Sequence, residues 1–265
     1  MERLKIVKIS PTQNMTVLVE TTLPRERHAE AAEKLMDYAG VYCEQVGFIE
    51  PAQSARARAR LQMMGGEFCG NATMSLAAFL CFQDEMPTGC EADIPLEVSG
   101  ADGVLSCRVR ALGEGAFEGT VQMPEPRAIE RRILHSGGAD YETVCVRMDG
   151  IAHILIDRKY EPQAETLLRA WAPLFEEEAV GFVACDFARN EIRPLVLVKP
   201  TGSAVWERGC GSGSAAYGAA MARKAGGAVK VAVGQPGGTI VVCADGGSVS
   251  ITGRVQIVMR GEAYL

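Results

Sequence analysis

Apolar and polar positions alternate along most of this chain, and a spacing of two residues is typical of half-buried β-strands. Residues 25–38 and 164–173 instead have the spacing of amphipathic helices. Residues 69–80 and 210–225 each begin with a Cys-Gly pair and continue as a helix-like stretch of small residues. The pattern predicts a strand-rich α/β (α+β) fold with a few helices. The expected strands are residues 4–9, 15–20, 46–49, 96–98, 104–109, 119–123, 144–147, 152–156, 180–184, 195–198, 229–233, 239–242, 249–251 and 254–260.

Two matched cysteine motifs begin the last two of these helices. They read Cys69-Gly70-Asn71-Ala72-Thr73-Met74-Ser75 and Cys210-Gly211-Ser212-Gly213-Ser214-Ala215-Ala216, about half the chain length apart. An internal duplication gives this arrangement, with one cysteine in each copy. We therefore expect one domain over residues 1–115, completed by a last strand at 254–265, and a second over 116–253. A ligand site is expected in the cleft between two such domains.

A cysteine at a helix start has a chemical use. The helix N-terminus presents unpaired N–H groups and positive partial charge, which favour both a thiolate and a bound carboxylate. Gly70 and Gly211 let a ligand approach the backbone, and Asn71 and Ser212 add side-chain donors. Two such thiols on opposite faces of one α-carbon predict an inversion in which one removes the α-proton and the other returns a proton. The aligned donors would stabilise the enediolate-like charge.

Composition narrows the class of protein. The net charge is −6, and no basic stripe interleaved with aromatics is present, which argues against nucleic-acid binding. The chain contains no long apolar run and no signal-peptide core, so we expect a cytoplasmic protein outside the membrane. Nine cysteines without a C-x-x-C pair give little support to a zinc or thioredoxin-like site. Apart from Cys69 and Cys210, most of the cysteines are expected to be buried and to pack as small hydrophobic residues. These are Cys81, Cys107, Cys145, Cys185 and Cys243.

Other chemistries fit less well. The Gly209-x-Gly211-x-Gly213 spacing lacks the last glycine and the later acidic residue of a dinucleotide-binding loop. No lysine has a recognisable pyridoxal-phosphate setting. A Cys-His hydrolase would need His28, His135 or His153 as its base, and such histidines are more often surface or satisfied core residues. A buried structural role for both cysteines is disfavoured by their matched motifs.

The residues resemble the diaminopimelate epimerase-like superfamily over nearly the whole chain. The two cysteine motifs carry the resemblance, together with Gln13-Asn14, the segment 43–50 and the turn Gln235-Pro236-Gly237-Gly238, which we interpret as structural. Within the superfamily they are most similar to histidine racemases that supply D-histidine for opine-type metallophore synthesis. The resemblance implies two pseudo-symmetric domains, each a twisted mixed sheet around a central helix, and two-thiol chemistry without metal or organic cofactor. It implies substrate contacts at Asn14, Gln45, Gly70, Asn71, Glu207, Gly211 and Ser212.

Departures from diaminopimelate epimerases bear on the substrate. Gly150-Ile151-Ala152-His153 replaces a Gly-Asn-Pro-His segment, and Ala179 replaces an Asn before Val-Gly-Phe. The loss of polar groups favours an amino acid with a less charged side chain, such as histidine. Arg208 keeps a dicarboxylate such as diaminopimelate open as an alternative.

Two further alternatives remain at this point. The same fold would also suit a small-molecule sensor or a thiol redox protein, neither of which exchanges the substrate α-proton. The only expected partner besides a small amino acid is a second copy, and Trp171, Phe175 or the last strand are its candidate contacts.

Overall fold

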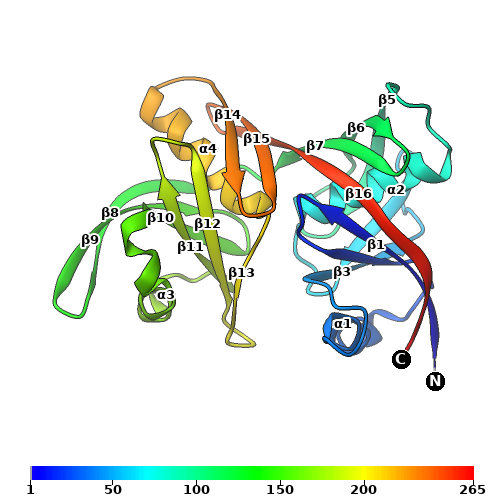
Figure 1. Ribbon diagram of the computed structural model, residues 1–265, viewed down its shortest axis with the longest axis horizontal. Helices are drawn as coiled ribbons and strands as arrows, with labels where there is room; N and C mark the ends of the chain where they lie inside the picture. The colour runs from blue at the N-terminus through cyan, green and yellow to red at the C-terminus, as the bar shows by residue number, and fades with distance from the viewer. Residues whose placement is uncertain (1) are drawn as a thin grey trace. The chain divides into compact units, whose positions relative to one another are not determined.

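The computed structural model describes residues 2–265 and divides into two compact units (Figure 1). Unit 1 contains the residues up to Gln122 together with Thr252–Leu265, and unit 2 contains Met123–Ile251. Strands dominate both units, and the predicted α/β fold class is confirmed. Each unit is described below by itself.

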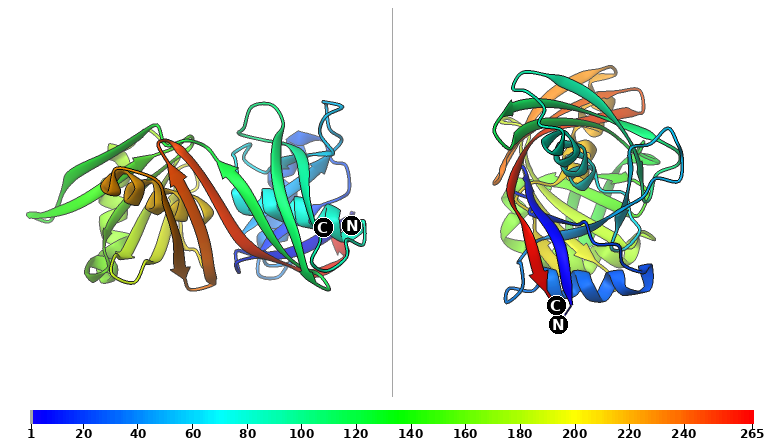
Figure 2. Two further views of the ribbon diagram at one scale, coloured as in Figure 1. Left: turned by 90° about the horizontal axis from the view of Figure 1, so that it is seen from above. Right: turned by 90° about the vertical axis from the view of Figure 1, so that its right-hand side faces the viewer.

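Unit 1 is a ring of strands around a helix. Its strands follow one another in chain order from β1 to β7, and β16 pairs with both β7 and β1, which closes the ring. Helix α2 runs through the middle of these strands, as the right-hand view of Figure 2 shows. The elements are β1 (Arg3–Pro11), β2 (Thr16–Val19), η1 (Arg25–Arg27), α1 (His28–Met36), β3 (Gln45–Glu50), β4 (Ala59–Met63), α2 (Gly70–Gln83), β5 (Glu91–Val98), β6 (Leu105–Gly113), β7 (Ala116–Met123) and β16 (Ser248–Tyr264).

The composition of α2 explains its central place. From Gly70 to Cys81 every residue is buried, so the helix has no solvent-facing stripe. A helix that is apolar all round belongs in a core. Gly119 on β7 leaves room for Met74, because a Cβ at that position would lie 2.8 Å from the Met74 Cβ. The first turn of α2 is thereby held inside the ring.

Unit 2 is an open sheet in the order β15-β14-β12-β11-β10-β9-β8, with β13 added to β12. Side chains of β10 alternate between its two faces: Ala152, Ile154 and Ile156 join a core with α3, whereas His153 points towards α4. The elements are β8 (Ala128–Ser136), β9 (Ala139–Arg147), β10 (Ile151–Asp157), η2 (Arg158–Gln163), α3 (Ala164–Trp171), η3 (Ala172–Leu174), β11 (Ala179–Asp186), β12 (Glu191–Val198), β13 (Ser203–Trp206), α4 (Gly211–Ala225), β14 (Val229–Gln235) and β15 (Gly238–Asp245).

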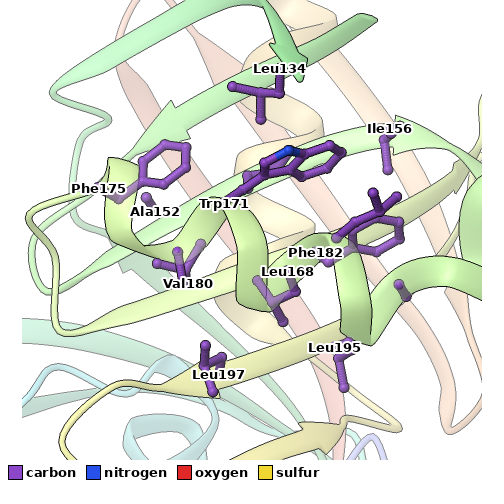
Figure 3. Packing of buried hydrophobic residues seen from close by; sticks show 14 of the residues in the cluster. Leu134, Ala152, Ile156, Leu168, Trp171, Phe175, Val180, Phe182, Leu195 and Leu197 are labelled. Carbon is purple, nitrogen blue, oxygen red and sulfur yellow. The ribbon is translucent and has the colours of Figure 1, made fainter. Parts of the chain in front are cut away.

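Trp171 is the last residue of α3, and its side chain is at the centre of the core between this helix and the sheet (Figure 3). Its ring is 1% exposed, and its indole N–H donates to the backbone oxygen of His135 at 3.0 Å. Phe175 is 4% exposed in the same cluster. The expectation that Trp171 and Phe175 contact a second copy is therefore wrong, because both side chains are used inside their own unit.

Several expected elements differ in the structure. The stretch at 25–38 is a short 3₁₀ turn followed by α1, which ends at Met36. The two strands expected at 249–251 and 254–260 form the single strand β16. Strands β4, β8 and β13 were not expected. Charged residues mask the alternation in β8, whereas β4 and β13 are only five and four residues long. Cys243 is exposed rather than buried, whereas Cys81, Cys107, Cys145 and Cys185 are buried as expected.

Candidate active site

Cys69 is the N-cap of α2. Its backbone is extended, and its sulfur accepts the N–H of Ala72 at 3.4 Å, a bond that satisfies one of the free donors of the first turn. The hydroxyl of Thr73 donates to the backbone oxygen of Cys69 at 2.7 Å and tightens the same turn. The thiol is half-buried. The helix start therefore fixes the sulfur at its positive end.

Two other predicted site residues of unit 1 lie around this thiol. The Cys69 thiol donates to Gln45 Oε1 at 3.0 Å. Gln45 Nε2 donates to Asn14 Oδ1 at 2.5 Å and to Thr16 Oγ1 at 2.7 Å. Asn14 Nδ2 in turn donates to Glu44 Oε2 at 2.7 Å. Asn14, Gln45 and Cys69 thus form one network, and Gly70 and Asn71 are buried in the adjoining first turn of α2.

Cys210 occupies the same position in unit 2. It caps α4, and its sulfur accepts the N–H of Gly213 at 3.2 Å. The Ser214 hydroxyl donates to the backbone oxygen of Cys210 at 2.7 Å, which repeats the Thr73 contact of unit 1. Cys210 is 2% exposed. Burial raises its pKa well above the ordinary thiol value, and the carboxylate of Glu207 raises it further.

The side chain of Gln235 holds the first turn of α4 in place through two hydrogen bonds. Its Oε1 accepts the backbone N–H of Cys210 at 2.7 Å, and its Nε2 donates to the Ser214 hydroxyl at 2.7 Å. Gln235 ends β14 and belongs to the turn that the sequence indicated as structural. The structure shows that this turn residue also contacts the start of α4, because it hydrogen-bonds to both Cys210 and Ser214.

His153 is a polar residue in the otherwise apolar run of β10. Its side chain is fully buried, and Nε2 lies 3.0 Å from the Ser212 hydroxyl, which lies 3.5 Å from the Cys210 sulfur. Its Nδ1 has no hydrogen-bond partner within residues 2–265. Burial lowers the pKa of His153 to about 4, so the ring is neutral near pH 7.

Glu207 and Arg208 follow β13 directly. The Glu207 backbone N–H donates to the Pro194 oxygen at 3.0 Å, and its half-buried side chain acts on Cys210. The Arg208 side chain is exposed, and its guanidinium donates to the backbone oxygen of Pro236 at 3.3 Å. Gly211 and Ser212 occupy the first turn of α4, beside the Cys210 sulfur.

The structure therefore gathers the predicted residues into two groups, one in each unit. Sequence reasoning missed Glu44 and Thr16 in the first group and His153 and Gln235 in the second. His153 left a trace in the sequence, since one histidine interrupts the apolar run Ile-Ala-His-Ile-Leu-Ile at 151–156. Gln235 was recognised only as part of a turn, because its contact with Cys210 depends on how β14 ends beside α4.

Two absences apply to residues 2–265. No group of three or more His, Cys, Asp or Glu side chains in this range is arranged to hold a metal ion. No helix in the same range combines the length and apolar character needed to cross a bilayer.

Comparison with solved structures identifies the fold. The chain superposes on a hydroxyproline epimerase from Agrobacterium vitis with a TM-score of 0.71, covering 99% of this chain and 93% of that one, at 15% sequence identity. The chain therefore shares the fold of this epimerase. By sequence, the chain is 27% identical to a diaminopimelate epimerase from Rhizorhabdus wittichii, over 92% of this chain and 89% of the relative.

A narrower group is defined by two further findings. Residues 3–264 match the family model described as the histidine racemase CntK N-terminal domain. The histidine racemase of Staphylococcus aureus is 31% identical over 97% of this chain and 96% of its own length. The chain belongs to this histidine racemase family, and the resemblance inferred from its motifs is confirmed. It is an isomerase of the racemase and epimerase class, which leaves the sensor and redox alternatives without support.

Proposed function

We propose that this protein is a cofactor-independent histidine racemase that interconverts L-histidine and D-histidine with Cys69 and Cys210 as its two acid–base groups. The observation that carries the proposal is the matched capping geometry of the two thiols. Each sulfur accepts the N–H of the residue three positions on, and each cysteine carbonyl is held by a hydroxyl four positions on. Membership of the histidine racemase family supports histidine as the substrate.

In the proposed reaction, one sulfur removes the α-proton as a thiolate while the other delivers a proton to the opposite face. The C–H bond breaks towards the first sulfur, and the electron pair moves into the carboxylate to form an enediolate. That pair then takes the proton of the second thiol, which leaves a thiolate there. Backbone N–H groups of the two helix starts, with Asn71 and Ser212, are proposed to bind the carboxylate and stabilise its growing charge.

The remaining contacts follow from where the polar groups lie. Asn14 and Gln45 present side-chain amides next to Cys69, and Glu207 presents a carboxylate next to Cys210. We assign these three to the substrate amino group or side chain. The Ser212 hydroxyl, which is itself next to the neutral ring of His153, adds an uncharged polar contact to the Cys210 thiol.

Proton NMR of the α-position in D₂O tests the proposal. The protein is incubated under reducing conditions with L-histidine, LL-diaminopimelate, L-glutamate and L-alanine in separate samples. Loss of the histidine α-proton signal together with formation of D-histidine is the expected result. Exchange with diaminopimelate alone would instead favour the dicarboxylate alternative, in which the exposed Arg208 binds the distal carboxylate. No exchange with histidine contradicts the proposal.

The cellular setting is part of the same proposal. A small amino acid is the expected partner, and a cytoplasmic location and a homodimer stay predictions from the sequence and its resemblance. With Trp171 and Phe175 buried, the last strand is the remaining candidate contact, and Val258 on it is 50% exposed. Sedimentation of the protein at two concentrations measures the assembly directly.

A further inference from the structure

A continuous chain of hydrogen bonds leads from the carboxylate of Glu44 to the sulfur of Cys69. It runs from Glu44 Oε2 to Asn14 Nδ2 at 2.7 Å, from Asn14 Oδ1 to Gln45 Nε2 at 2.5 Å, and from Gln45 Oε1 to Cys69 Sγ at 3.0 Å. Glu44 lies just before β3 and is half-buried. None of the sequence motifs assigned it a role.

The carboxylate sets the direction of every bond in this chain. An ionised carboxylate only accepts hydrogen bonds, so Asn14 must turn its NH₂ group towards Glu44. The Asn14 side-chain oxygen then faces Gln45, which must donate to it from its own NH₂ group. The carbonyl end of Gln45 is left facing Cys69.

Thr16 favours the same direction without fixing it, because a hydroxyl can also turn to donate. Its buried hydroxyl donates to the Asn14 backbone oxygen at 3.1 Å, so in this arrangement its oxygen faces Gln45 as an acceptor. Gln45 Nε2 donates to that oxygen at 2.7 Å. Thr16 and Gln45 are direct neighbours on the parallel strands β2 and β3, which fixes this contact by strand register.

We propose that Glu44 is a positioning residue that holds the carbonyl end of Gln45 against Cys69 and so keeps this thiol protonated in the free protein. A carbonyl oxygen 3.0 Å from sulfur is satisfied by an S–H donor and repels a thiolate. The N–H of Ala72, at 3.4 Å, favours the thiolate, so loss of the opposing carbonyl contact is expected to shift Cys69 towards the thiolate. The inference rests on the proposed function for its meaning, because it concerns the protonation state in which Cys69 meets the substrate.

Peptide-resolved alkylation tests this role without substrate. The protein is treated with iodoacetamide across a pH series, and mass spectrometry gives the labelling rate at Cys69, with exposed Cys90 of the same unit as the internal reference. In the Glu44→Gln variant the first amide can rotate and let Gln45 present its NH₂ group. We expect the pH midpoint of labelling at Cys69 to fall by about one unit, which is roughly tenfold faster labelling at neutral pH. The Cys90 midpoint stays unchanged.

Matched variants separate orientation from charge. Glu50→Gln removes a carboxylate at the other end of β3, far from Gln45. This variant is expected to leave the pH midpoint of Cys69 labelling unchanged. Thr16→Val removes the second constraint and shifts the midpoint in the same direction as Glu44→Gln. Repeating the series in 1 M salt suppresses long-range charge effects, because the Debye length there is about 3 Å. A shift that persists in salt supports the proposal, and a shift that vanishes overturns it.

The outcomes also distinguish this inference from the proposed racemase activity. An unchanged Cys69 midpoint in both Glu44→Gln and Thr16→Val, in proteins whose unfolding temperature shows them to be folded, overturns the positioning role even if racemisation is observed. A salt-resistant shift in a protein that racemises no amino acid supports the positioning role and removes the proposed function.

Discussion

The side-chain carbonyl of Gln235 accepts the backbone N–H of Cys210 at 2.7 Å, while its amide group donates to the hydroxyl of Ser214. That hydroxyl holds the Cys210 carbonyl at 2.7 Å. One glutamine thus fixes both polar groups of the cysteine backbone, directly or through one residue. The Cys210 sulfur is held in place by its own main chain.

Replacing Gln235 by Leu is therefore expected to impair racemisation. Each buried polar group that loses its partner costs about 1–3 kcal/mol, so kcat should fall roughly 10- to 100-fold while KM changes little. Steady-state racemisation measured by circular dichroism checks this. Gln256→Leu is the matched control, because Gln256 also donates to a backbone oxygen, that of Gly115 in unit 1. Equal losses in both variants would point to a general loss of stability.

Single substitutions of the two thiols test the two-base assignment. Cys69→Ser and Cys210→Ser should each abolish detectable racemisation, because a hydroxyl is a far weaker base near pH 7. Each variant should still exchange the α-proton of only one enantiomer, and the two variants should select opposite enantiomers. NMR in D₂O with separate L- and D-histidine samples measures this. Cys90→Ser and Cys243→Ser change exposed thiols and should retain full activity.

Gly181 on β11 is opposite His153 in the parallel pairing with β10. A Cβ at 181 would overlap the imidazole ring, reaching within 2.8 Å of its Cε1. Gly181→Ala should destabilise the protein by about 1–3 kcal/mol and lower activity by displacing the ring from Ser212. Urea unfolding gives the stability. Gly227→Ala is the control, since its Cβ meets nothing within 4 Å. In the Gly181→Ala background, His153→Ala should recover stability, a favourable coupling that a double-mutant cycle reports.

Stability at acidic pH should depend on His153. In the unfolded chain this ring takes up a proton near its ordinary pKa of 6.5, whereas burial lowers the folded-state pKa to about 4. The unfolded state therefore binds more protons between these values, and stability present above pH 6.5 is lost as the pH falls towards 4. The full difference is about 3 kcal/mol. His153→Gln should lose less stability than the wild type between pH 7 and pH 4.5 in urea unfolding. His135→Gln, at an exposed position, should follow the wild type.

The sequence predicted those parts of the molecule that local patterns control. Cys69 and Cys210 could be placed at helix starts because a Cys-Gly pair before a run of small residues favours that position. Most buried strands followed from alternation. Edge and polar strands such as β8 did not, because arginine and glutamate residues at exposed positions hide the period of two. Gln235 and Glu44 were missed for another reason: each acts through contacts with residues distant in the chain, and no local pattern records such contacts.

The path of β16 has a consequence for the order in which the protein folds during synthesis. Unit 2 is one uninterrupted segment, Met123–Ile251, so all of it is synthesised before residues 252–265 of unit 1. Unit 1 has its first strand, β1, paired with that last strand, from Arg3 with Tyr264 to Pro11 with Val255. Closing a ring across so many residues is slow compared with forming local contacts. The ring of unit 1 therefore closes only after unit 2 has been synthesised, although unit 1 contains the first strand of the chain.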